Sequence, residues 1–206
     1  MNLEHFIEGI YTEIPTFPRN VYPWQVIADL EGFIKGMMPF LNDKDFDVSD
    51  NIAVHKSATV ESHVSLKGNT IIGPKCVVKS GAYLRNGVFL TSNVTIGANV
   101  EIKQSIILKN SCAAHLNYVG NSLIGSDVNL KAGSILANHF NERNDKGITV
   151  LLDGRTVETG LTKFGSLIGD GSRIGANSVL NPGTLLDKKS IVPRLTHIDL
   201  VKSSNI

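Results

Sequence analysis

The sequence has little of several features that mark other classes of protein. It holds only two cysteines in 206 residues, which excludes the disulfide framework of a small secreted domain. Lysine and arginine total 20 against 19 acidic residues, so the net charge of +1 gives no overall field that would attract nucleic acid or an anionic membrane. No apolar run approaches the roughly 20 residues that span a bilayer. We therefore expect a cytoplasmic protein of one domain with a small appendage.

What the sequence does contain is an aliphatic residue at every sixth position. The series comprises Val48, Val54, Val60, Leu66, Ile72, Val78, Leu84, Leu90, Ile96, Ile102 and Leu108, and Ala114 continues it. A period of six fits neither an α-helix nor simple strand alternation, whereas it fits a short strand followed by a turn. Three such units make an 18-residue triangular coil with the aliphatic side chains on its axis. The pattern predicts an all-β fold, a parallel β-helix, and a β-sandwich would not keep this spacing.

The register of the repeat breaks twice. After Ala114 the run HLNYVGNSL carries four extra residues, and a second break spans about residues 138 to 165. Breaks in a solenoid are usually loops on a binding face. Within the second break, ITVLLDGRTVETG alternates around Asp153-Gly154, which predicts a projecting β-arm over residues 141–162.

The segments before and after the repeat do not follow its six-residue pattern. Residues 1–45 precede it, and Pro23 followed by WQVIADLEGFIKGMM predicts a helix. We expect this segment to cap the open end of the β-helix, in preference to binding a partner. The β-helix domain is predicted over residues 46–193, with a C-terminal tail at 194–206. Cys76 and Cys112 are 36 residues apart, so we expect them two coils apart in one column and beyond disulfide reach.

A basic column is predicted on one face of the β-helix. Lys67, Arg85 and Lys103 each follow an aliphatic position at 18-residue spacing, so they stack with steps of about 5 Å. Like charges at that range repel, and a bound phosphate or pyrophosphate would relieve the repulsion. A solvated row of cations is the alternative. His115 occupies the equivalent position on a different face, at the start of the first break, where it is either structural or catalytic.

The run AHLNYVGNSLIGSDVNLKAGSILAN, together with EIKQS and the pair Leu84-Arg85, carries a family resemblance. Residues 48–190 resemble the acetyltransferase domain of the bifunctional glucosamine-1-phosphate acetyltransferase/N-acetylglucosamine-1-phosphate uridylyltransferase family, whose hexapeptide repeats form a left-handed parallel β-helix. The long second break resembles the arm of archaeal-type sugar-phosphate nucleotidylyl/acetyltransferases. The 45 residues before the repeat are too few for a uridylyltransferase domain, so uridylyl transfer is not expected.

The resemblance implies roles for individual residues. His115 falls on the general base, and Glu101 is a weaker candidate for orienting it. The sugar-phosphate ligands fall on Arg85, Lys103, Tyr118, Asn129 and Lys163. The positions that contact the coenzyme, acetyl-CoA, fall on Ala132, Asn138 and Ala176. The family builds its active sites between subunits of a homotrimer, and its reaction uses no metal.

The implied function is N-acetylation of an amino-sugar 1-phosphate from acetyl-CoA. Two alternatives stay open at this point, and a third is disfavoured. The acceptor could be a nucleotide-linked amino sugar, which the same basic column could bind. The chain could be a scaffold or regulatory subunit without activity. A metal-dependent β-helix enzyme, such as a γ-class carbonic anhydrase, would need three histidines that converge on zinc, and the histidine spacing shows no such set.

Overall fold

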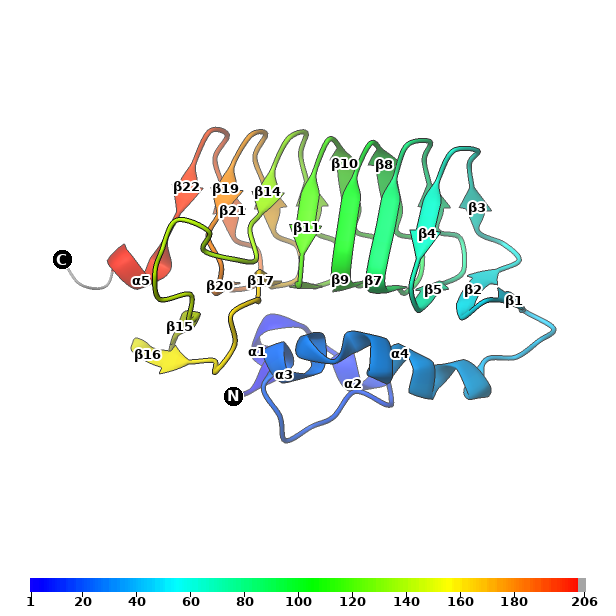
Figure 1. Ribbon diagram of the computed structural model, residues 1–206, viewed down its shortest axis with the longest axis horizontal. Helices are drawn as coiled ribbons and strands as arrows, with labels where there is room; N and C mark the ends of the chain where they lie inside the picture. Colours follow the sequence, from blue (N-terminus) through cyan, green and yellow to red (C-terminus); the bar gives the residue numbers. More distant parts are fainter. Residues whose placement is uncertain (204–206) are drawn as a thin grey trace.

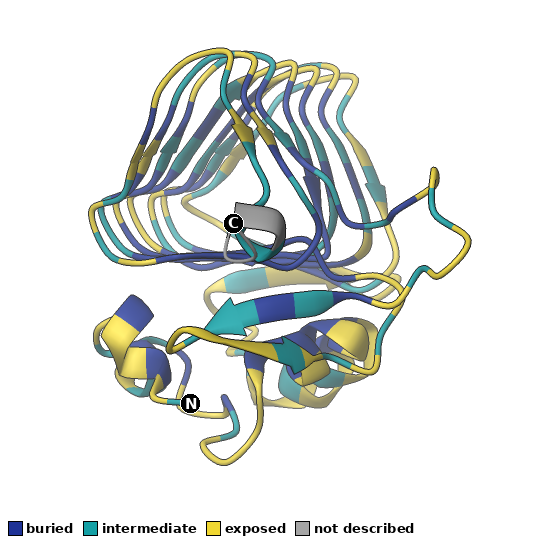
Figure 2. Cartoon of the chain, turned by 90° about the vertical axis from the view of Figure 1, so that its left-hand side faces the viewer, coloured by how far each residue is buried: buried dark blue, intermediate teal, exposed yellow. Residues whose placement is uncertain are grey.

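The computed structural model of the chain describes residues 1–203, with side chains as far as Val201. Short parallel strands wind into stacked coils and form a three-sided prism, with helices along one side of it (Figures 1 and 2). The predicted parallel β-helix is confirmed. Within the described residues, no helix is long and apolar enough to cross a membrane.

Each side of the prism is one set of stacked strands. Face 1 consists of β3 (Thr59–Val60), β6 (Val77–Val78), β8 (Thr95–Ala98), β10 (Cys112–His115), β13 (Asn129–Leu130), β18 (Arg173–Ile174) and β21 (Ile191–Val192). Face 2 consists of β4 (Ser65–Lys67), the first halves of β7 (Tyr83–Leu90) and β9 (Glu101–Ile107), then β11 (Tyr118–Gly120), β14 (Ile135–Leu136), β19 (Val179–Leu180) and β22 (His197–Ile198). Face 3 consists of β2 (Ile52–His55), β5 (Thr70–Ile72), the second halves of β7 and β9, then β12 (Leu123–Ile124), β17 (Ser166–Ile168) and β20 (Thr184–Leu186).

The predicted axial register is correct from Val54 to Ile102 and then slips by one residue. Leu90 lies opposite Ile107 rather than Leu108, and Ile96 lies opposite Ala113 rather than Ala114. The cause is a tighter corner, because β7 turns through two residues between faces 2 and 3, whereas β9 turns through one, Gln104, at a positive φ of 48°. From Ile102 to Leu136 the axial residues are thus separated by five, six, six, five, six and six residues, with no insertion. The loop expected after Ala114 does not exist, and the interpretation of HLNYVGNSL was wrong.

Two smaller expectations about the repeat also fail. Val48 is half-exposed rather than axial, because β1 (Phe46–Ser49) pairs antiparallel with β2 as a hairpin at the start of the prism. Cys112 lies opposite Thr95, which in turn lies opposite Val77, so the two cysteines do not share a column. Both thiols are free, and Cys76 is fully buried.

The N-terminal segment does not cap the end of the prism. Its helices α1 (Leu3–Phe6), α2 (Ile10–Glu13), α3 (Pro23–Ala28) and α4 (Leu30–Met37), followed by the 3-10 turn η1 (Met38–Phe40), run along face 3 (Figure 1). Face 3 carries an apolar residue on its outer side in successive coils. These outer residues are Ile71, Phe89, Ile106, Leu123, Leu167 and Leu185. They pack against the buried side of the helices, including Ile27, Leu30 and Ile34, because apolar surface on both sides of a sheet must be covered.

The arm is a hairpin, as predicted, but it does not project. Strand β15 (Thr149–Leu152) pairs with β16 (Arg155–Glu158), and the turn residues Asp153 and Gly154 both have positive φ. The hairpin folds back under face 3 beside the helices (Figure 2), where Ile148 and Val150 are fully buried in the same apolar cluster.

The β-helix also continues beyond the predicted boundary at residue 193. Strand β22 pairs with β19 through Val179 and His197, and the short helix α5 (Leu200–Ser203) follows it. Leu200 packs against the axial core, so part of the predicted tail belongs to the prism.

Candidate functional site

The centre of face 2 gathers the predicted basic column around one carboxylate. Lys67, Arg85 and Lys103 lie opposite one another on successive coils, as predicted. Both Nε and one terminal nitrogen of Arg85 lie 2.8 Å from a carboxylate oxygen of Glu101. Partial burial lowers the pKa of Lys103, and the positive charges of Lys163 and Arg85 lower it further, against an opposing effect of Glu101. The single carboxylate of Glu101 does not neutralise these cations. The cluster therefore keeps a net positive charge, which an anion site requires.

Tyr118 stands beside this cluster in a network of polar side chains. Its Cα lies opposite that of Glu101, and its hydroxyl donates to Asn138 Oδ1 at 3.2 Å. Asn138 Nδ2 donates in turn to Asn121 Oδ1 at 2.6 Å. Burial raises the pKa of the Tyr118 phenol, and the nearby Glu101 charge raises it further. The hydroxyl is therefore a neutral donor fixed in direction.

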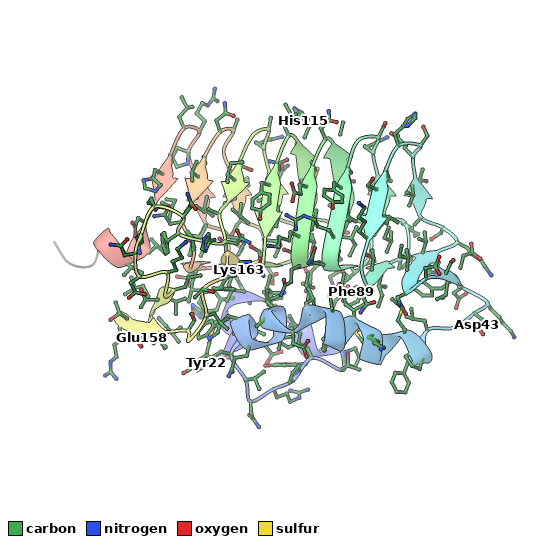
Figure 3. All side chains as sticks on the ribbon, in the orientation of Figure 1. Tyr22, Asp43, Phe89, His115, Glu158 and Lys163 are labelled. Atoms are coloured by element: carbon green, nitrogen blue, oxygen red, sulfur yellow. The ribbon has the colours of Figure 1, made fainter. Side chains whose placement is uncertain are left out.

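Lys163 reaches the cluster from the loop between the arm and β17 (Figure 3). The next residue, Phe164, is fully buried, and its ring centroid lies 5.9 Å from that of Trp24 of α3 with the ring planes tilted by 56°. Its backbone N–H donates to the carbonyl of Asn138. His139 Nδ1 lies 3.2 Å from the carbonyl of Thr162, which holds the two ends of the long break together. Because Phe164 is buried against the N-terminal helices, the exposed Lys163 next to it is held over face 2.

His115 lies at the corner between faces 1 and 2 (Figure 3). It ends β10, and the next residue, Leu116, turns the corner at a positive φ of 57°. The His115 side chain is exposed and has no hydrogen-bond partner among the described residues. Along the same corner runs an open pocket lined by Ala114, His115, Lys131, Ala132, Gly175, Ala176, Pro193 and Arg194. The two alanines implied as coenzyme contacts therefore share a groove with His115.

Two of the predicted residues stand apart from these groups. Asn129 lies on face 1 between Cys112 and Arg173, and its Oδ1 is buried without a hydrogen-bond partner. Glu101 does not orient His115 within this chain, because its carboxylate pairs with Arg85 across the corner from the imidazole.

Sequence reasoning missed Asn121, Lys131 and Arg194. Asn121 was hidden by the one-residue slip. Lys131 and Arg194 carried a signal, because Lys131 directly follows axial Leu130 and Arg194 lies two positions after axial Val192, as His115 lies two after Ala113. Among the described residues there is no group of three or more histidine, cysteine or acidic side chains that could hold a metal ion.

The chain is similar in sequence to several known proteins. Residues 48–140 match the family model described as the GMPPB C-terminal domain. The bifunctional protein GlmU of Methanococcus vannielii is 34% identical over 82% of this chain and 41% of its own length. A bifunctional sugar-1-phosphate nucleotidylyltransferase/acetyltransferase of Sulfurisphaera tokodaii is 38% identical over 65% of this chain and 38% of its own length. The chain is a relative of these bifunctional proteins.

The resemblance to GlmU and to the archaeal-type proteins is thus confirmed, and the chain spans about two fifths of the length of the curated relatives it matches. Among solved structures, the acetyltransferase domain of PglB from Neisseria gonorrhoeae FA1090 aligns with 88% of this chain and 66% of that one, at 13% identity and a TM-score of 0.32. That likeness is too low to support an argument about function.

Proposed function

We propose that the chain is an acetyl-CoA-dependent N-acetyltransferase whose acceptor is an amino-sugar 1-phosphate. The observation that carries the proposal is the placement of two complementary features beside one corner of the prism. On one side of the corner lie three cations, Arg85, Lys103 and Lys163, that suit a phosphate. At the corner itself, an unpaired histidine lines an open groove.

In this proposal the cations and the Tyr118 hydroxyl hold the sugar phosphate, and the coenzyme lies in the groove past Ala132 and Ala176. The sugar amine attacks the thioester carbonyl carbon, so a C–N bond forms, the C–S bond breaks and the coenzyme leaves. His115 accepts the proton that the nitrogen loses and returns it to the departing thiolate, because imidazole titrates near neutral pH. A backbone N–H at residues 132–133 would stabilise the negative charge that develops on the carbonyl oxygen.

The same arrangement favours a site shared between subunits. His115 and the cationic cluster lie on two sides of a corner, so a neighbouring prism against that corner would enclose both reactants. A cyclic homotrimer closes three such contacts.

The test is release of free thiol from acetyl-CoA in the presence of a panel of amino-sugar phosphates and nucleotide-linked amino sugars. We expect turnover with glucosamine 1-phosphate or a close analogue. Absence of thiol release with every acceptor would overturn the proposal and favour a non-catalytic scaffold.

A further inference from the structure

We propose that face 2 carries a second anion subsite, formed by Lys67 and Arg85 and organised by Tyr83, so that the face binds a diphosphate in preference to a monophosphate. The inference deepens the proposed function, on which it rests for acetyl transfer to a phosphorylated amino sugar, and it refines the phosphate part of that acceptor. It would make a diphosphate-linked amino sugar a better acceptor than a sugar 1-phosphate.

The first step of the argument is position. Lys67 lies opposite Arg85 and Arg85 opposite Lys103, so three cations line one row of adjacent coils. Coils are spaced by about 4.8 Å, so the row extends about 10 Å. A single phosphate held near Lys103 and Lys163 does not extend to Lys67, whereas the two phosphoryl groups of a diphosphate lie along the row.

The second step is charge. Arg85 is the cation of the row that has an ion pair with a carboxylate, that of Glu101. Lys67 is exposed, and no acidic partner for it occurs among residues 1–203. Glu31 of α4 lies near the neighbouring corner, beside Gly68 and Gly87, without forming an ion pair with the row in the described structure. Among the described side chains, the Lys67 end of the row thus forms no ion pair, and a bound anion would relieve its repulsion with Arg85.

The third step is order. The ring of Tyr83 lies near two cations, with Lys67 Nζ and the Arg85 guanidinium carbon each 5.7 Å from its centroid. Cation–π attraction restrains two long side chains that would otherwise lose rotamer freedom on binding. Tyr83 is therefore a positioning residue. Its Cα lies opposite that of Glu101, in the row next to the cations.

The experiment is titration calorimetry of the full chain with inorganic phosphate and with pyrophosphate, at constant ionic strength and pH. We expect the wild type to bind pyrophosphate about tenfold or more tightly than phosphate. Lys67→Ala should weaken pyrophosphate binding about tenfold, as for loss of one charge-assisted contact, and leave phosphate binding unchanged. Tyr83→Leu should weaken pyrophosphate binding by a smaller factor, and Tyr83→Phe should restore it because the ring remains.

Lys79→Ala is the matched control, because Lys79 occupies the equivalent repeat position on face 1 and pairs with Glu61 at 2.8 Å. Equal affinity of the wild type for the two anions would overturn the inference. An equal loss of pyrophosphate affinity in Lys67→Ala and Lys79→Ala would also overturn it, because the loss would then come from the lower net charge of the protein and not from a contact at Lys67. These outcomes do not depend on turnover, so failure of the acetyl-transfer assay and failure of the subsite are distinguishable.

Discussion

At the residue scale, His115 is the most direct test of the chemistry. His115→Ala should lower the rate of acetyl transfer by about 10²–10⁴-fold, the usual effect of losing a general base. The exposed side chain fills no cavity, so the free energy of unfolding measured in urea should be unchanged. His63→Ala is the matched control, because His63 is an exposed corner residue in an earlier coil and its carbonyl accepts from Gly81. Full activity of His115→Ala would show that the assigned role is wrong.

Lys103 illustrates a conflict between stability and binding at the same scale. Its folded-state pKa lies below the ordinary value of about 10.4, so its charge destabilises the fold wherever the amine is protonated in both states. That cost is fully present at pH 7 and disappears as the pH rises through the lowered pKa. Lys103→Met should therefore raise Tm by about 1–3 °C at pH 7 and less at pH 10, while raising KM for the acceptor.

Differential scanning calorimetry at the two pH values checks this expectation. Lys79→Met should give no gain at pH 7, because Lys79 has a carboxylate partner on the open face 1. A Tm for Lys103→Met that is lower than wild type at pH 7 would contradict the electrostatic account of the site.

At the scale of elements, the arm should behave as part of the core. Val150 of β15 is fully buried against face 3, so Val150→Ala should reduce the free energy of unfolding by about 2 kcal/mol. Thr156→Ala, on the exposed side of β16, should change it by less than about 0.5 kcal/mol. Urea titration followed by circular dichroism measures both. If Val150→Ala and Thr156→Ala had the same free energy of unfolding, the arm would project into solvent and not pack on face 3.

At the scale of the whole molecule, the covered face limits how prisms can associate. Helices and arm occupy face 3, which leaves faces 1 and 2 and the corner between them for a second copy (Figure 2). That corner exposes Leu116 and Leu195, at 61% and 77% of their full accessible surface. We expect a trimer in sedimentation at micromolar concentration and a monomer for Leu116→Asp, since a carboxylate would be desolvated in the contact. Sedimentation of the wild type as a monomer would contradict the shared site.

The sequence alone determined the parallel β-helix, the hairpin and the basic row, because each depends on short-range periodicity or on a turn dipeptide. It also held an unused signal for the cover on face 3. Adjacent apolar residues such as Ile71-Ile72, Phe89-Leu90 and Ile106-Ile107 place one side chain on the axis and the other outside.

Only the tertiary structure decided the rest. The corner between faces 2 and 3 takes one residue at Gln104 but two at Asn86-Gly87. This difference in backbone conformation leaves the six-residue pattern nearly intact, yet it moves the axial positions from Ile107 to Val119 by one residue, and a second five-residue gap moves those from Ile124 to Leu136 by two. The place of the N-terminal helices and of the arm depends on which face lacks cover. Lys163 lies close enough to Lys103 to lower its pKa because Phe164 is buried against Trp24. That contact joins segments about 140 residues apart, so no local pattern encodes it.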